Sequence, residues 1–576
     1  MKFFHVYNED CYKGLVKNGL INKDTGFKVQ NVFSMPREKQ FNEIAKKGGK
    51  LHTLIKENKY PFYIDRIAGG ILWFEYPYDK ELFKEYEDIL GDWFLGCQHH
   101  ESGSNRKQDW ALIRKKTGHD GPYDVDKLKE LTKSSYAITP YGEVLYGTSQ
   151  DSVEHYSKQT YAKGYQEYIE EMRDMYKRRM EDTDGHIVPC DSYYVVPRLQ
   201  HSVGIKTFMP EVGCQIPWMR MQIALIRGMA KAKNKTWGTY YECWKASDET
   251  TFTMPVFNYT PINEWYLTQE NHPDDFTSNG KNGGSSRLLQ NRIYYYSLMA
   301  GADYLSEEWG LNCSYTDMDE FTLSEYGIVK KDFINTALTL QGIKAKVPFA
   351  IVLPTKYEAL EIPDSINYLK EKFNVYRDYY LEYKLTPEEK EYFGHIENLL
   401  KYIFDREEDR YGNERHVITN SRFGDVFDII YQDEDYSTFK NYEYLIDATK
   451  DDEFIKQNKH QDLKILSSKD LYKLEEQLQV LIKETMPCYV DDLCWLVSTD
   501  ENGQNYLTIF NNEGNQRTIE KGDVVDERAT KTVTVEFKNE VNLELYRKAQ
   551  EVKIEKIDNK KYKITISGAG FGLFKF

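Results

Sequence analysis

Strand-like apolar segments alternate with helical segments over residues 60–345, and this alternation limits the fold more than any other feature of the chain. The strand-like segments are residues 61–69, 92–100, 185–194, 204–213, 236–244 and 301–309. Apolar residues with helical spacing lie between them, at residues 79–90, 161–180, 217–234 and 287–300. Such alternation is typical of parallel βα units, and no Gly-rich phosphate-binding turn follows the first strand. We therefore expect a (β/α)8 TIM barrel rather than a doubly wound sheet.

The rest of the chain has patterns of its own. Residues 1–58 are polar and in places basic, which predicts an N-terminal extension packed on a catalytic barrel of residues 59–345. Over residues 346–485 short apolar strands alternate with acidic helices, which predicts a flavodoxin-like α/β domain. Over residues 486–576 the apolar residues recur with a period of two around ENG and NEG turns. That pattern predicts a small antiparallel C-terminal β-sandwich domain.

Composition argues against two classes of protein. The chain has 92 Asp and Glu against 76 Lys and Arg, a net charge of −16 without a local basic patch, so it would repel nucleic acid. The mean hydropathy is −0.69, and no apolar run reaches the ~18 residues of a membrane helix, so we expect no membrane association. Aromatic residues make up 14%, with 46 Tyr, and their rings stack well on sugars, which weakly favours a carbohydrate ligand.

Cysteine usage and the N-terminal segment bear on the compartment. The eight Cys are scattered without a CxxC pair, as is typical of reduced thiols in a cytosolic protein. The first fifteen residues carry Glu9 and Asp10 and lack the apolar stretch of a signal peptide. We therefore expect a cytoplasmic protein, unless the natural chain carries a leader that this sequence lacks.

Acidic residues stand where four of the expected barrel strands finish, and aromatic residues lie beside them. They are Asp191 in PCDSYY, Glu211 in FMPEVG, Glu242 in YYECW, and Glu307 and Glu308 in SEEWG. The carboxyl ends of the strands build the active site of a parallel barrel. A glycosidic bond is cleaved by one carboxylic acid that protonates the leaving oxygen and a second carboxylate that acts as nucleophile or as base for water. This pattern predicts a glycoside hydrolase.

The expected mechanism is double displacement on an oligosaccharide, with neither metal nor cofactor. We expect Glu211 to be the general acid/base and Glu307 or Glu242 to be the nucleophile, with Glu308 as the next candidate. Glu307 and Glu308 are neighbours and point to opposite sides of a strand, so at most one of them can face the barrel axis. If residues 301–309 are the eighth strand, residues 236–244 are the seventh, and Glu242 becomes the stronger nucleophile. The side chains expected to bind the sugar are His99, Asp191, Trp244, Trp309, Asp65 and Tyr241.

Two stretches resemble a known group of enzymes. SSRLLQNRIYYYSLMAGADYLSEEWG, followed by FTLSEYGIVKKDFI, resembles the closing βα units of retaining glycoside hydrolases of clan A, and MQIALIRGMAKAKNKTWGTYYECW resembles the unit before them. The domain order is similar to that of family 42 β-galactosidases. That resemblance implies a middle domain that serves oligomerisation, here a homo-oligomer through the flavodoxin-like domain. Clan A enzymes carry their acid/base in an Asn-Glu pair after the fourth strand, and no such pair stands at an expected strand end here.

Two other functions fit parts of the same pattern. A non-catalytic carbohydrate-binding protein on a glycosidase-like barrel would also have lost the Asn-Glu pair. It would be distinguished by the lack of two carboxylates that face each other across the barrel. A metal-dependent hydrolase could use His99, His100 and Asp191, but a ligand set needs convergent partners and the sequence has no second His cluster.

Overall fold

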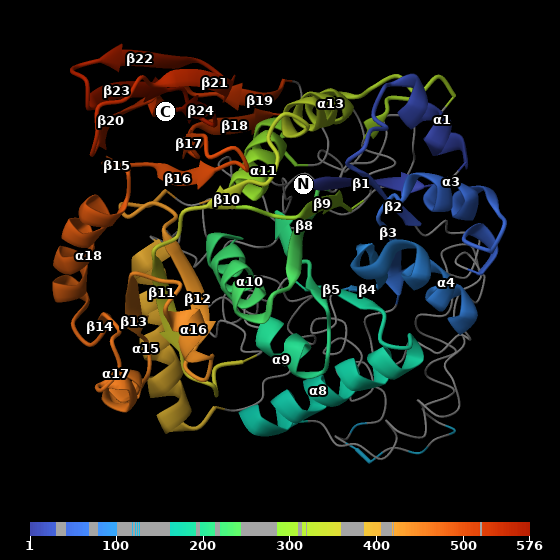
Figure 1. The fold of residues 1–576 in the computed structure, drawn as a ribbon, viewed down its shortest axis with the longest axis horizontal. Coiled ribbons are helices and arrows are strands. Elements are labelled where there is room, and N and C mark those ends of the chain that lie inside the picture. The colour runs from blue at the N-terminus through green and yellow to red at the C-terminus, as the bar shows by residue number, and fades with distance from the viewer. Residues whose placement is uncertain are drawn as a thin grey trace.

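The computed structural model describes residues 1–7, 9–29, 42–67, 79–100, 162–191, 196–213, 219–243, 285–308, 314–317, 319–358, 385–404, 420–518 and 521–576, with the single positions 118, 121, 122, 124, 126 and 418. Three parts are arranged side by side (Figure 1). A barrel of strands and helices, coloured blue to yellow-green, lies next to a smaller α/β part in gold and orange, and the C-terminal strands in red lie above this part and beside α11 in the view of Figure 1.

The first part is a nearly closed barrel of parallel strands. Its strands are β1 (Lys2–Tyr7), β2 (Thr25–Val29), β3 (Phe62–Ile67), β4 (Phe94–His100), β5 (Ile187–Cys190), β6 (Thr207–Phe208), β7 (Glu211–Gly213), β8 (Thr236–Glu242) and β9 (Tyr304–Glu307). They neighbour one another in the order β5-β4-β3-β2-β1-β9-β8, and β6 and β7 both pair with β8. β6 and β7 keep one register against β8 on either side of Pro210, which has no N–H to donate, so together they fill one of eight positions.

Helices follow the strands around the barrel. They are α1 (Glu9–Lys17), α3 (Lys50–Asn58), α4 (Lys80–Leu90), α8 (Tyr165–Asp182), α9 (Pro197–Ser202), α10 (Met219–Lys233), α11 (Arg287–Met299) and α13 (Glu325–Ala337), with the short η1 (Gly91–Trp93) before β4. The barrel closes where β9 pairs with β1, and the backbone N–H of Lys2 donates to the carbonyl of Asp303 at 2.8 Å. Within the described ranges no helix has both the length and the apolar character needed to cross a membrane.

The barrel begins earlier in the chain than we expected. The six strands expected between residues 61 and 309 are all present, and β1 and β2 precede them within the segment 1–58 that we had interpreted as an extension. That interpretation was wrong, because both strands are central members of the barrel. They are buried along their length, as KFFHVY and TGFKV, so they lack the apolar–polar alternation that marks a half-exposed strand.

The second part is a four-stranded parallel sheet in the order β12-β11-β13-β14. Its strands are β11 (Phe349–Leu353), β12 (Phe427–Tyr431), β13 (Tyr444–Asp447) and β14 (Ile465–Ser467). Its helices are α15 (Pro387–Phe404), α16 (Tyr436–Phe439), α17 (Glu453–Asn458) and α18 (Leu471–Thr485), with the short η2 (Lys450–Asp452). Parallel pairing requires helical crossovers, which agrees with the α/β character expected for residues 346–485.

The third part consists of antiparallel sheets. One has the order β10-β16-β17-β24-β21, with β10 (Lys344–Ala345), β16 (Cys494–Thr499), β17 (Asn505–Phe510), β24 (Phe571–Lys575) and β21 (Glu544–Ala549). A second has the order β15-β20-β23-β22, with β15 (Cys488–Val490), β20 (Lys531–Phe537), β23 (Lys561–Ile566) and β22 (Val552–Lys556). A separate hairpin pairs β18 (Asn515–Thr518) with β19 (Gly522–Val525), and η3 (Glu527–Ala529) follows it.

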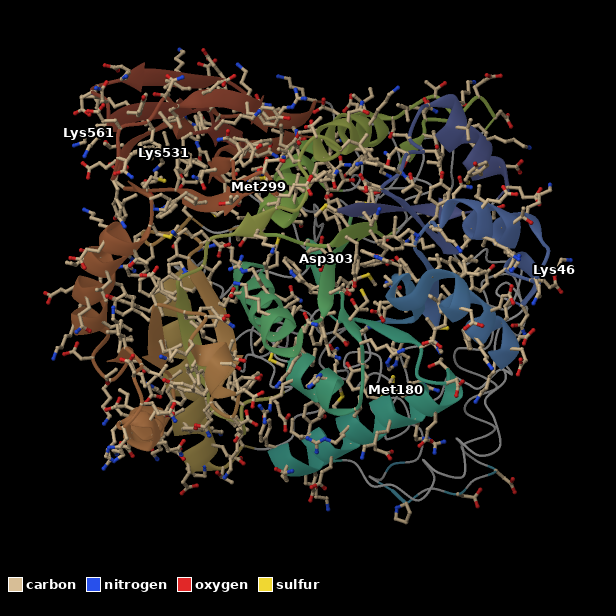
Figure 2. All side chains as sticks on the ribbon, viewed as in Figure 1. Lys46, Met180, Met299, Asp303, Lys531 and Lys561 are labelled. Carbon is tan, nitrogen blue, oxygen red and sulfur yellow. The ribbon has the colours of Figure 1, made fainter. Side chains whose placement is uncertain are left out.

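Two barrel helices are buried on all sides, although a helix on the outside of a barrel is ordinarily amphipathic. Every residue of α10 from Met219 to Ala230 is buried, because the sheet of the second part covers its outer face. Gly228 makes this approach possible, since a Cβ there would lie 2.3 Å from the carbonyl oxygen of Ile429. The C-terminal strands cover α11 in the same way, and its last residue, Met299, lies between the barrel and these strands (Figure 2).

Buried ion pairs join α10 to the parallel sheet of the second part, β12-β11-β13-β14. Arg227 Nε lies 2.6 Å from Asp428 Oδ1, and Arg227 Nη1 lies 3.4 Å from Asp425 Oδ2. Lys231 Nζ donates to the other carboxylate oxygen of Asp428 at 2.5 Å, and the Tyr442 hydroxyl donates to that oxygen at 2.9 Å. Burial alone would raise the pKa of Asp428, but Lys231 and Arg227 outweigh burial and hold that pKa below its usual value.

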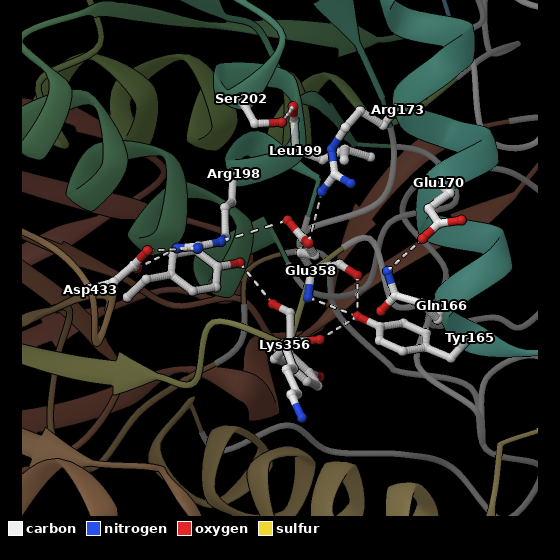
Figure 3. A network of polar contacts seen from close by, with 12 residues as sticks. Tyr165, Gln166, Glu170, Arg173, Arg198, Leu199, Ser202, Lys356, Glu358 and Asp433 are labelled. Atoms are coloured by element: carbon white, nitrogen blue, oxygen red, sulfur yellow. Dashed lines mark hydrogen bonds and ion pairs between the residues drawn. The ribbon is translucent and has the colours of Figure 1, made fainter.

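A second polar network joins helices α8 and α9 to the loops that follow β11 and β12 (Figure 3). Arg198 forms two hydrogen bonds with the Asp433 carboxylate, at 2.5 and 2.8 Å. Glu358 lies 3.1 Å from Arg173 and 3.6 Å from Arg198, so one carboxylate links both helices. The Tyr165 hydroxyl donates to the carbonyl of Lys356 at 2.6 Å. The barrel and the second part are therefore joined by ion pairs as well as by apolar packing.

We predict that Arg227→Met lowers the free energy of unfolding by about 3 kcal/mol, because it leaves the buried Asp428 with Lys231 as its remaining cation. Chemical denaturation at neutral pH measures this. Since the pKa of Asp428 is lowered in the folded protein, the stabilisation is present at neutral pH and is lost as the pH falls below about 4. Arg528→Met, which removes an exposed ion pair with Asp526, is the control and should leave the unfolding curve unchanged. Equal losses in both variants would contradict the role given to the buried pair.

Candidate active site

The barrel interior shows which side of each strand faces the axis. Its apolar filling consists of Phe4, Tyr63, Leu95, Val188, Cys190, Met209, Tyr240 and Tyr304. Gly238 leaves the space for the Tyr304 ring, because a Cβ there would lie 2.1 Å from that ring. Successive residues of a regular strand point to opposite sides, so a candidate can be assigned to the interior or to the helix side by its distance in sequence from these residues. In β4 the register against β3 shifts by one residue next to Gly96 (φ 86°), and this bulge reverses the alternation after Leu95.

Glu211 lies on the interior side. It begins β7, two residues after the interior Met209, and its register partner on β8 is the interior Tyr240. Only 1% of the residue is exposed. Its backbone N–H donates to the carbonyl of Asp191 at 3.2 Å, and this bond links β7 to the end of β5. The expected acid/base is thus a buried carboxyl that faces the barrel axis.

Glu307 lies on the opposite side of its strand. The Tyr294 hydroxyl of α11 donates to one oxygen of its carboxylate, and Lys330 of α13 forms an ion pair with the other oxygen. Lys330 also donates to the Ser314 hydroxyl at 2.5 Å. This carboxylate therefore joins β9 to two helices outside the barrel, a position that does not favour the nucleophile role we expected for it.

Glu308 continues the interior series. Tyr304 and Ser306 face the axis, and Glu308 follows them in a step of two. Its backbone N–H donates to the carbonyl of Tyr241 at 2.8 Å, so the β8–β9 ladder extends through this residue. Only 4% of the residue is exposed. Of the neighbouring pair, the one on the axis side is Glu308.

His99 and Asp191, which we expected to bind sugar, face the helices. The His99 ring packs edge-on against the Tyr176 ring of α8 at 5.5 Å. Asp191 accepts a hydrogen bond from the Tyr176 hydroxyl at 2.5 Å and one from Gln200 of α9 at 2.9 Å. The structure brings these residues together, but around Tyr176 between the barrel and its helices.

Tyr241 also faces the helices. Its hydroxyl shares a hydrogen bond with Ser285, and Ser285 in turn bonds the Tyr326 hydroxyl at 2.9 Å. Burial, with Tyr326 nearby, raises the pKa of Tyr241 well above its usual value, so this hydroxyl stays protonated. Its role here is to hold Ser285, which lies just before α11.

The remaining candidates are described in part. Trp244 and Trp309 lie outside the described residues. The backbones of Asp65 and Glu242 belong to β3 and β8, where Glu242 is in register with Gly213, and the description does not extend to their side chains. With β1 and β2 counted, β9 is the eighth barrel strand and β8 the seventh, which is the order that favours Glu242 over Glu307.

Polar residues that we did not expect from the sequence cross the barrel interior. Lys28 of β2 lies with its Nζ 5.0 Å from the centre of the Tyr240 ring, and it donates to the carbonyl of Glu307. The Tyr63 hydroxyl bonds the Ser306 hydroxyl at 2.6 Å. The signal for Lys28 was present, because it is a charged residue within the apolar run TGFKV, but that run was not recognised as a strand.

The C-terminal part reaches the carboxyl end of the barrel. Both Arg287 and Leu288 at the start of α11 donate their backbone N–H groups to Asp523 of the β18–β19 hairpin, at 2.9 and 3.3 Å. Asn515 of the same hairpin donates to the Ser286 hydroxyl at 2.7 Å. A carboxylate at a helix N-terminus is favourable. The hairpin thereby fixes the start of α11.

Among the described residues no group of three or more His, Cys, Asp and Glu side chains is arranged to hold a metal ion. Because His99 and Asp191 face α8, the described residues give no support to the metal-dependent alternative.

Comparisons with known proteins found matches of low similarity among solved structures. No protein-family model and no curated protein matches the chain. The catalytic module of a family 98 glycoside hydrolase from Streptococcus pneumoniae, solved with the LewisY pentasaccharide, is 10% identical with a TM-score of 0.40, over 100% of this chain and 98% of that one. Alpha-L-fucosidase isoenzyme 2 from Paenibacillus thiaminolyticus is 8% identical with a TM-score of 0.42, over 100% and 99%. The resemblance to clan A and family 42 is not confirmed.

We predict that Glu307→Gln lowers the free energy of unfolding by about 3 kcal/mol, because Lys330 then stays buried without its ion pair. The double variant Glu307→Gln/Lys330→Met should recover part of this loss, since it leaves neither charge alone. Chemical denaturation of both proteins measures the difference. A stable Glu307→Gln protein with its function abolished would instead show that this carboxylate acts in the site.

Proposed function

We propose that the chain is a glycoside hydrolase that cleaves oligosaccharides with two interior carboxylates, Glu211 and Glu308. One observation carries the proposal. Of the candidate carboxylates whose side chains are described, these two continue the axis-facing series at the carboxyl ends of their strands, where parallel barrels carry out chemistry.

The spacing of the strands suits this chemistry. Glu211 is on the sixth barrel position and Glu308 follows the eighth, with β8 between them. Neighbouring strands are about 4.8 Å apart, so the two backbones are roughly 10 Å apart, and side chains that reach toward the axis narrow this distance. Glycosidases work with carboxyl groups about 5–9.5 Å apart. Both groups can therefore flank one glycosidic bond.

In the proposed double displacement, Glu308 attacks the anomeric carbon as a carboxylate while Glu211 gives its proton to the leaving oxygen. The C–O bond to the leaving group breaks as the bond to Glu308 forms. Glu211 then takes a proton from water, whose oxygen displaces Glu308 from the anomeric carbon. Burial favours the protonated form that Glu211 needs for the first step. Position 242, which follows 238 and 240 on the intervening strand, is the alternative nucleophile position.

We also propose that residues 346–485 form a flavodoxin-like domain through which the protein assembles as a homo-oligomer. The order β12-β11-β13-β14, with all four strands parallel, supports the flavodoxin-like assignment. Sedimentation analysis of the purified protein tests the assembly, and a monomer at every concentration would contradict it.

Glycosidase activity is tested with a panel of chromogenic α- and β-glycosides and natural oligosaccharides. Cleavage of one sugar identifies the reaction and the substrate together. The anomer formed first, read by NMR, then distinguishes retention from inversion. Binding of a sugar without cleavage across the panel would favour the carbohydrate-binding protein instead.

We predict that Glu211→Gln and Glu308→Gln each lower kcat by about 10³-fold with the fold preserved, because each removes a group that transfers a proton or attacks the sugar. Steady-state kinetics, with circular dichroism to check folding, measure this. The matched control is Glu453→Gln on α17, an exposed carboxylate remote from the barrel, which should keep full activity. Full activity in either barrel variant would exclude that residue from the catalytic pair.

A further inference from the structure

Lys28 is a cation inside the barrel. It belongs to β2, 0% of the residue is exposed, and it follows the interior Gly26 in a step of two. Its side chain reaches past β1 within the interior, where Nζ lies over the Tyr240 ring of β8 and donates to the carbonyl of Glu307 on β9. A buried ammonium group is costly, so its place in the interior calls for a function.

The position of Lys28 relates it to the two proposed catalytic carboxylates. The carbonyl it binds belongs to the peptide bond that joins Glu307 to Glu308. From covalent geometry, Nζ therefore lies about 5 Å from the Cα of Glu308, whose side chain shares the interior. The Tyr240 ring lies under Nζ, and Tyr240 is on β8, where its register partner on the neighbouring strand β7 is Glu211. The cation thus contacts the peptide group that leads into Glu308, whereas strand β8 lies between that contact and Glu211.

A cation beside one of two carboxyl groups separates their protonation states. An opposite charge within about 4–6 Å favours the ionised form of a carboxyl group, and burial favours the neutral form of the other. Acid and nucleophile in a double displacement need this difference, because one must hold a proton while the other must not.

We propose that Lys28 is a positioning residue that keeps the Glu308 carboxyl ionised, and so makes Glu308 the nucleophile and Glu211 the acid. This inference rests on the proposed glycosidase function. It adds a residue of β2 to a pair whose acid and nucleophile cannot be told apart from the strand ends alone.

The test is the pH dependence of kcat/KM in Lys28→Met, a neutral side chain of similar length. The acid limb of this profile reports the ionisation of the nucleophile in the free enzyme. Loss of the cation raises the pKa of Glu308, so the acid limb should move to higher pH by about one unit, with roughly tenfold lower kcat/KM on that limb and recovery at higher pH. Lys28→Arg, which keeps the charge, should restore the acid limb. A uniform fall at every pH, or an unmoved limb, would overturn the proposal.

Lys330→Met is the matched control, because Lys330 is an equally buried lysine that pairs with Glu307 on the other side of β9. The acid limb of the pH profile of Lys330→Met should lie at the same pH as in the wild type. A shift equal to that of Lys28→Met would show that loss of any buried cation near β9 has this effect, and would overturn the specific role of Lys28.

A measurement without substrate separates this inference from the proposed function. If Lys28 and Glu308 interact, the loss in Tm of Lys28→Met/Glu308→Gln is smaller than the sum of the two single losses. Additive losses would overturn the pairing even in an active enzyme. Smaller-than-additive losses in a protein that cleaves no glycoside would support the pairing while the glycosidase proposal fails.

Discussion

The arrangement of the barrel and the β12-β11-β13-β14 sheet depends on the buried ion pairs that Arg227 forms with Asp425 and Asp428. A charge in this position is tolerated only where carboxylates receive it, so α10 can dock only where Asp425 and Asp428 stand. The same helix follows the strand that carries Glu211. Helix α10 therefore both joins the barrel to the second part and supports the strand that carries Glu211.

The C-terminal part has the corresponding effect on α11. Asp523 receives the first backbone N–H groups of this helix, and Asn512 accepts from Arg292 at 2.7 Å. α11 in turn holds Glu307 through Tyr294, on the strand that leads to Glu308. The helices that flank β8 are thus supported from outside by parts of the chain far away in sequence. This explains why α10 and α11 carry so few of the exposed polar residues expected for barrel helices.

Because successive residues of a strand point to opposite sides, each described carboxylate could be assigned to the axis side or to the helix side of the barrel. From the sequence we could state that Glu307 and Glu308 point to opposite sides, but not which one faces the axis. The six strands of residues 61–309 were predictable because short apolar segments alternate with helical segments in this part of the chain. β1 and β2 were missed because a strand buried on both faces has no alternation, and with them Lys28 was missed as a residue of the interior.

The sequence by itself determined the alternation of strands and helices, the parallel barrel that this alternation builds, and the acidic residues at the ends of its strands. These are local properties, set by the spacing of apolar side chains along the chain. The tertiary structure alone decided which carboxylates face the axis, and that Glu307 joins β9 to helices and Lys28 shares the interior with Glu308. Those facts depend on the closure of β9 against β1 and on contacts between residues about 280 positions apart, which no local spacing encodes.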